Sequence, residues 1–209
     1  AEMIRALPPR STLRLEELVI EFIPITHSIL HTVAVNVSNG EESVLIASDF
    51  KLDETPLLGP KTDYERLRKL GNGQLLAALI GSVRADEPGS TPSEADVRGM
   101  LRQAMEESTD GGGLIYVSTF SSHMARLKSI VDIAYEIGRV PVMVGRSLKN
   151  YCKAAMEVDL VDFPAELPIY GRPNTAKRAL RQIASRREDY VLICTGHQGE
   201  HTSALTRIA

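Results

Sequence analysis

The stretch that decides the fold is LIYVSTFSSH, residues 114–123. An apolar run, Leu114–Thr119, is followed at once by serines and a histidine, the order expected where a strand ends and a helix begins. The same order recurs along the rest of the chain. The further elements that we predict are a helix over about 122–137, a strand over 141–145, a helix over about 147–158, a helix near 175–184 and a strand over 190–194. Strands that alternate with helices predict a parallel sheet and an α/β fold.

The first part of the chain predicts a different arrangement. Residues 12–25 alternate polar and apolar around a Glu-Glu turn, and two short apolar runs follow at 32–37 and 43–48. This pattern is typical of an antiparallel meander. Residues 64–70 have helical spacing, and the apolar run Leu75–Ile80 predicts a strand that is buried on both faces.

After this strand, the segment Thr91-Pro92-Ser93-Glu94 predicts the start of a helix that continues through Met105. We therefore place a domain boundary in the region 81–93.

The composition is that of a globular protein. The chain has 209 residues, of which 43% are hydrophobic and 24% charged, and its formal net charge is -3. These values exclude a disordered chain and a strongly basic nucleic-acid coat.

Cys152 and Cys194 form no CxxC pair, so we expect neither a disulfide scaffold nor a thiolate zinc site. We expect a reducing, cytoplasmic location. No stretch is long and apolar enough for a membrane helix. Because the chain begins at Ala1, we expect it to be a piece of a longer protein.

Small polar residues follow the strands of the second half. Ser121, Ser122 and His123 follow the first strand, Arg146 and Ser147 the second, and Gly196-His197-Gln198-Gly199 the last. Ligands of parallel sheets gather at the carboxyl ends of the strands, where free backbone N–H groups and hydroxyls can bind phosphate. Serine and glycine also cap helices in general, so each loop taken alone could be either a phosphate contact or a helix cap.

Two residues of the first half could bind a metal ion. His27 ends one predicted strand and Asp49 follows another, and an imidazole with a carboxylate suits a hydrolytic zinc. Two ligands do not make a site, and a capped strand end is the alternative. His31, His201 and Asp53 are weaker candidates.

Taken in order, several segments resemble the ribonuclease J family, most closely its archaeal branch. EFIPITHSI (21–29) and SDFKLDETPLLGPKTDYERLRKLG (48–71) are similar to the second half of the family's metallo-β-lactamase αββα domain. The β-CASP domain of the family resembles four later segments, which are DEPGSTPSE (86–94), YVSTFSSHMARL (116–127), VMVGRS (142–147) and ICTGHQGE (193–200). The resemblance implies a partial metallo-β-lactamase domain over 1–81 and a β-CASP domain, with a mainly parallel sheet flanked by helices, over 82–209.

The resemblance also implies roles for single residues. His27 and Asp49 match family positions that bind two zinc ions, with Asp49 as the bridging carboxylate; the chain would hold no catalytic residue beyond these ligands. The positions implied to contact RNA or its 5′-phosphate are Ser121, Ser122, His123, Arg126, Ser147, His197 and Gln198.

The chain departs from the family pattern in several places. It has no HxHxDH cluster and ends before the family's later histidine motifs, so both ends look truncated. Gly81-Ser82 stands where the family has an acidic residue, unless Asp86 or Glu87 replaces it. Leu30 and His201 stand where the family usually has proline.

The resemblance predicts a zinc-dependent, 5′-to-3′ exonucleolytic ribonuclease, with endonucleolytic cleavage left open. It implies single-stranded RNA with a 5′-monophosphate as substrate, a homodimer and a cytoplasmic location, and this chain alone is expected to be inactive. The alternative is a non-catalytic RNA-binding or scaffold paralogue. A small-molecule phosphate binder is a third reading.

RNA contacts are expected to go to phosphates rather than to bases. Residues 177–187 hold five basic residues and no acid, whereas aromatic residues make up only 5% of the chain. A solvated helix face remains the alternative for this basic segment.

Overall fold

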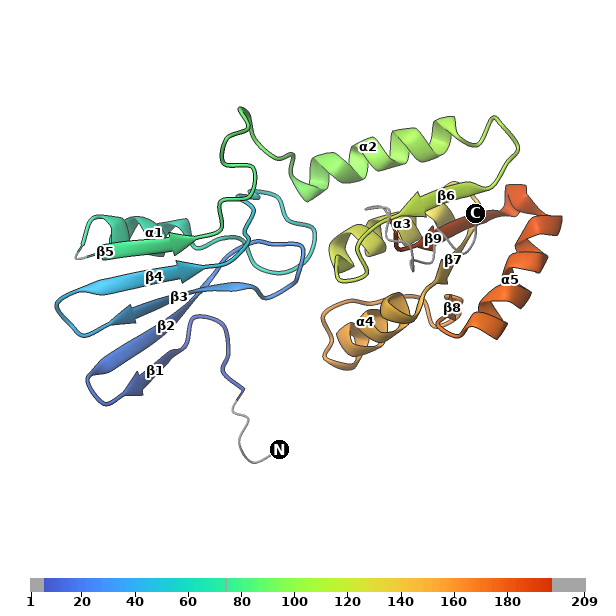
Figure 1. Ribbon diagram of the computed structural model, residues 1–209. Helices are drawn as coiled ribbons and strands as arrows, with labels where there is room; N and C mark the ends of the chain where they lie inside the picture. Colours follow the sequence, from blue (N-terminus) through green and yellow to red (C-terminus); the bar gives the residue numbers. More distant parts are fainter. Residues whose placement is uncertain (1–5, 74, 197–209) are drawn as a thin grey trace. The chain divides into compact units, whose positions relative to one another are not determined.

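The computed structural model describes residues 6–73 and 75–196 and divides into two compact units, Ala1–Ser93 and Glu94–Ala209 (Figure 1). We call them unit 1 and unit 2. The loop of residues 82–93 groups with unit 1 in this division. That residues 1–81 form part of a separate domain, with its boundary at Gly81, stays a prediction.

Unit 1 is built on a five-stranded sheet with the strands in sequence order (Figure 1). Its strands are β1 (Thr12–Leu15), β2 (Leu18–Pro24), β3 (Val33–Ser38), β4 (Ser43–Ala47) and β5 (Leu75–Ile80). The first four pair antiparallel, which confirms the predicted meander, and β5 pairs parallel with β4. Strands β2, β4 and β5 therefore run in the same direction.

One face of this sheet is covered by α1 (Tyr64–Gly71). The helix begins where the Asp63 carboxylate accepts a hydrogen bond from the Arg66 backbone N–H at 3.1 Å. Its buried Leu70 joins Ile23, Ala34 and Ala47 in a small apolar core.

The predicted burial of β5 is wrong. The strand forms as expected, but its side chains are mostly exposed: Leu76 is 66% and Leu79 60% accessible. In the described part of the chain β5 has one neighbouring strand, β4, and little covers its faces. An apolar run indicates that a strand is suited to a buried position. It does not show that the described residues include the elements that would cover the strand.

Unit 2 contains a four-stranded parallel sheet of order β6-β9-β7-β8. The strands are β6 (Ile115–Ser118), β7 (Val140–Val144), β8 (Ile169–Tyr170) and β9 (Tyr190–Cys194). The parallel sheet confirms the prediction from the strand–helix alternation. Strand β8 was not predicted, because two residues are too few to show a periodic pattern.

Helices cover both faces of the central strands of unit 2 (Figure 1). They are α3 (Met124–Glu136), α4 (Arg146–Glu157) and α5 (Pro173–Ser185), whereas α2 (Glu94–Glu107) packs against α3. Val142 and Leu192 pack with Ile183 of α5 on one face. On the other face Met143 lies against α4, where its sulfur is 3.7 Å from the Cys152 thiol. The centre of this sheet is therefore closed to solvent, as the α/β prediction requires.

None of the helices in the described ranges has the length and apolar character needed to cross a membrane.

Candidate metal and phosphate sites

The carboxyl ends of three strands of unit 1 lie on the same side of its sheet, which we call its strand-end edge. Because β2, β4 and β5 run in the same direction, the residues that follow them, His27, Asp49 and Gly81, all belong to that edge. The Gly81 backbone N–H donates to the Ala47 carbonyl at 3.1 Å, which extends the β4–β5 pairing to this point. The edge therefore carries both predicted metal ligands.

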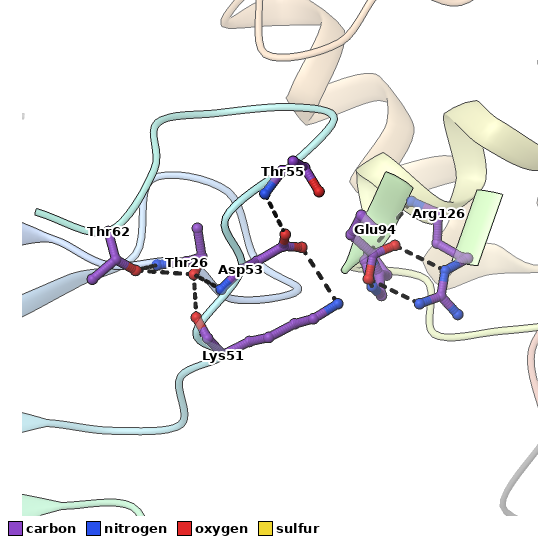
Figure 2. A network of polar contacts seen from close by, with 8 residues as sticks. Thr26, Lys51, Asp53, Thr55, Thr62, Glu94 and Arg126 are labelled. Carbon is purple, nitrogen blue, oxygen red and sulfur yellow. Dashed lines mark hydrogen bonds and ion pairs between the residues drawn. The ribbon is translucent and has the colours of Figure 1, made fainter. Parts of the chain in front are cut away.

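A bridge between Thr26 and Lys51 closes this edge (Figure 2). The Lys51 N–H donates to the Thr26 carbonyl at 2.8 Å, and the Thr26 hydroxyl donates back to the Lys51 carbonyl. The Thr26 N–H donates to the Thr62 hydroxyl at 3.0 Å. Since Thr26 precedes His27 and Lys51 follows Asp49 closely, the bridge holds the two candidate ligand segments against each other.

The Asp53 carboxylate supports the same bridge from inside (Figure 2). It is 1% exposed, accepts the Thr55 N–H at 2.9 Å and lies 3.4 Å from the Lys51 ammonium. Its own backbone N–H donates to the Thr26 hydroxyl at 3.2 Å. A buried carboxylate that is bound to these partners supports the local structure.

His27 and Asp49 suit zinc in kind but not in number. His27 is half-buried, with Nε2 3.3 Å from the Ser28 hydroxyl, and Asp49 is exposed. Within residues 6–73 and 75–196, no group of three or more His, Cys, Asp or Glu side chains could hold a metal ion. A hydrolytic zinc takes about three protein ligands. The described residues therefore form at most part of a metal site.

Gly81, where the resemblance implies an acidic residue, leaves no room for a side chain. A Cβ atom at this position would lie 2.9 Å from the Ser48 carbonyl oxygen and 3.1 Å from the Asp49 carboxylate. Any side chain would force the backbone to shift. Of the two possible replacements, Glu87 is held in an exposed ion pair with Arg84, and Asp86 is exposed. Their suggested role therefore stays a prediction.

The strand ends of unit 2 gather the predicted phosphate contacts. Because β9 lies between β6 and β7, the Ser121–Ser122 turn after β6 and the start of α4 at Arg146 and Ser147 flank the segment that follows β9 and contains Gly196. Helices α3 and α4 begin here, so the N-termini of two helices belong to one end of the sheet, and in α3 the Met124 and Arg126 N–H groups already have acceptors. Gly145, at φ 152°, makes the turn into α4 in a backbone conformation that other residues rarely adopt. His197 and Gln198 lie outside the described residues.

Arg126, one of the predicted phosphate contacts, is bound to Glu94 (Figure 2), and His123, another, lies near the same carboxylate. Arg126 donates from Nε and Nη2 to the two oxygens of the buried Glu94 carboxylate at 3.0 and 2.9 Å. His123 caps α3 through Nδ1, and its Nε2 lies 3.4 Å from Glu94 Oε1. No pattern in the sequence indicates this role of Glu94, because an acid at the start of a helix normally indicates only a favourable charge there.

The cysteines of unit 2 are structural rather than nucleophilic. Both are free and buried, and burial raises the pKa of Cys152 to about 11. Burial also raises the pKa of Cys194, whose sulfur lies 2.5 Å from the Tyr116 hydroxyl, and the pKa of Tyr116 itself. At neutral pH all three groups keep their protons, so none supplies a thiolate or phenolate.

Helix α5 presents a basic face. Lys177, Arg178 and Arg181 are exposed on the side opposite the buried Ala179 and Ile183, and the helix contains no acid. Among residues 6–73 and 75–196 these three cations form no ion pair, and exposed cations of this kind suit a polyanion.

Comparisons with known proteins identify the family. Residues 112–209 match the family model described as ribonuclease J, beta-CASP domain. Ribonuclease J of Methanocaldococcus jannaschii is 40% identical over 91% of this chain and 43% of its own length. Ribonuclease J of Pyrococcus abyssi is 37% identical over 93% of this chain and 43% of its own length. Ribonuclease J2 of Bacillus subtilis is 30% identical over 99% of this chain and 35% of its own length. The chain thus spans less than half the length of these relatives.

A solved structure, described as a protein of unknown function from Enterococcus faecalis V583, shares the fold. Its TM-score is 0.53 at 12% identity, with 93% of this chain and 56% of the other covered. The matches to archaeal and bacterial ribonuclease J proteins confirm the resemblance that the motifs indicated, and the chain belongs to the ribonuclease J family.

Proposed function

We propose that this chain is the central part of a zinc-dependent ribonuclease that degrades single-stranded RNA from its 5′ end. The observation that carries this proposal is the strand-end edge of unit 1, where the Thr26–Lys51 bridge holds the segments of His27 and Asp49 together. The names of the relatives support the class of reaction.

In the complete protein, His27 and Asp49 would be zinc ligands, together with donors from outside the described residues. Bound zinc would activate water and stabilise charge on the phosphate oxygens. This chain contributes the imidazole, the carboxylate and the polar network of Thr26, Thr62 and Asp53 that holds their segments. We expect the isolated chain to have no measurable activity, because two donors do not bind a hydrolytic zinc stably.

Unit 2 would bind the RNA. The turns after β6 and β7 offer the Ser121, Ser122 and Ser147 hydroxyls and two helix N-termini to a terminal phosphate. The basic face of α5 would attract the rest of the strand through its phosphates. A 5′-monophosphate requirement, a homodimer and a cytoplasmic location belong to the same proposal.

A non-catalytic paralogue is the second candidate, and Gly81 is the observation that favours it. The family's acidic residue is absent at a point where the backbone of Ser48 and the carboxylate of Asp49 leave no space for a side chain. In that case the fold would persist as an RNA-binding or scaffold module.

Metal content and RNA hydrolysis separate the two candidates. The experiment uses the longest natural reading frame that contains this sequence and compares wild type with Asp49→Ala. Glu41→Ala, which changes an exposed acid in the β3–β4 turn of the same sheet, is the matched control. For the nuclease we expect about two zinc ions per chain and a loss of at least roughly 100-fold in hydrolysis for Asp49→Ala alone. Absence of zinc and of hydrolysis in the wild type would establish the non-catalytic reading.

A further inference from the structure

Glu94 is a buried carboxylate at the first position of α2, and two of its neighbours, His123 and Arg126, are among the predicted phosphate contacts. It is 7% exposed and receives both donors of the Arg126 fork. A buried carboxylate is tolerated when its charge is compensated and its oxygens are hydrogen-bonded, and Arg126 meets both conditions. The positive charge of Arg126 is therefore balanced inside the protein.

The contacts of His123 determine which of its nitrogens carries the proton. Nδ1 accepts the Arg126 backbone N–H at 3.4 Å, so in the neutral imidazole the proton resides on Nε2. This Nε2 lies 3.4 Å from Glu94 Oε1. Both nitrogens of His123 thus face protein groups.

The turn before α3 is closed by its own backbone. The His123 N–H donates to the Phe120 carbonyl at 3.3 Å, and the Met124 N–H donates to the Ser122 carbonyl at 3.0 Å. The His123 backbone thus closes the turn, while its side chain caps α3 and lies against Glu94, so one residue joins the turn to Glu94. The two serine hydroxyls form no hydrogen bond with any residue of the described ranges.

We infer that Glu94 is a positioning residue for 5′-phosphate recognition: it anchors His123 and Arg126, so that the Ser121 and Ser122 hydroxyls are presented to the phosphate. This inference rests on the proposed function and sharpens it. Arg126 acts as an anchor in this arrangement, and the serines with the N-terminus of α3 make the contact.

Glu136 offers a matched control for Glu94. It also links α2 to α3, since its carboxylate binds Arg98 at 2.9 Å and pairs with Arg102, but it lies at the far end of α3 from the serine turn. Glu136→Gln therefore removes ion pairs between the same two helices, at a more exposed position, and leaves His123 untouched.

The test measures binding of two fluorescent single-stranded RNAs, alike except for a 5′-monophosphate or a 5′-hydroxyl, to the 209-residue chain. We expect the wild type to prefer the monophosphate, Glu94→Gln to reduce that preference about tenfold, and Glu136→Gln to keep it. Arg126→Met should cause the same loss as Glu94→Gln. The double variant should cause no further loss, because each single substitution already breaks the Glu94–Arg126 ion pair. The ¹⁵N shifts of the His123 imidazole should change in Glu94→Gln and not in Glu136→Gln.

Each other outcome has a definite meaning. A wild type that binds both RNAs equally contradicts the phosphate site of the proposed function, and the inference falls with it. A wild-type preference that survives in Glu94→Gln, or is lost equally in Glu136→Gln, overturns only the inference. If Glu94→Gln binds both RNAs more tightly while Arg126→Met weakens both, Arg126 is itself a phosphate ligand and Glu94 its competitor, which also overturns the inference.

Discussion

The two units bury their sheets differently. In unit 2 both faces of β7 and β9 are covered, and Leu192 and Ile193 have no exposed surface. In unit 1, helix α1 covers one face, and on the other face Ile46 and Leu79 stay largely exposed.

The difference shows that the units depend on different forces. Unit 2 has an apolar interior of the kind that supplies most of the folding free energy of a domain. Unit 1 has a small core and relies in addition on the buried polar network around Thr26 and Asp53. Its candidate metal ligands thus sit beside the polar network, whereas the candidate phosphate turns of unit 2 rest on close-packed strands.

The largest effect should come from shortening a buried leucine of unit 2. Leu192→Ala shortens a fully buried side chain that packs with Val142 and Ile183. It should lower the unfolding free energy of unit 2 by about 3 to 4 kcal/mol. Leu79→Ala, at a position that is 60% exposed in unit 1, should cost less than about 1 kcal/mol. Urea unfolding followed by hydrogen exchange of peptides from each unit measures both. Equal losses would contradict the difference in burial.

A smaller effect is expected in unit 1 from removing the buried carboxylate of its polar network. Asp53→Ala leaves the Lys51 ammonium and the Thr55 N–H without this acceptor and should cost roughly 2 to 3 kcal/mol. Glu65→Ala, which removes an exposed acid paired with Lys69 on α1, should leave stability unchanged. Should the two variants unfold at the same urea concentration, the network would not support unit 1.

The smallest effect concerns alkaline pH and unit 2. Burial raises the pKa of Cys152 from its ordinary value of 9.0 to about 11. Between these values the unfolded chain has lost the thiol proton and the folded chain keeps it, so folding stability is complete below pH 9 and falls up to pH 11. The loss from this group is about 2 kcal/mol. Unfolding measured from pH 8 to 11 should show the decline in unit 2, and Cys152→Ala should make it shallower. An identical slope in that variant would show that Cys152 does not contribute.

Sequence periodicity located nearly all the helices and strands, because each element carries its pattern in its own residues. The run Leu114–Thr119 and the strand Ile115–Ser118 agree to within one residue at each end, and the helix over 64–70 appears as Tyr64–Gly71. The burial of β5 could not be predicted in this way, since it depends on what lies beside the strand.

The candidate site was predictable in part. Strand direction and residue type placed His27 and Asp49 at one sheet edge, and the serines at another. The Thr26–Lys51 bridge and the pairing of Arg126 with Glu94 join residues that are 25 and 32 positions apart, and no local pattern indicates them.

The sequence by itself determined the family, the α/β class, the order of the elements and the types of side chain at the strand ends. Those properties follow from local periodicity and from motifs, which are contained in short stretches of chain. Only the tertiary structure decided that the Asp53 and Glu94 carboxylates are each buried within their own unit, that position 81 has no room for a side chain and that β5 is exposed. Burial and ion pairing depend on distances between segments far apart in the chain, and these distances exist only once the chain has folded.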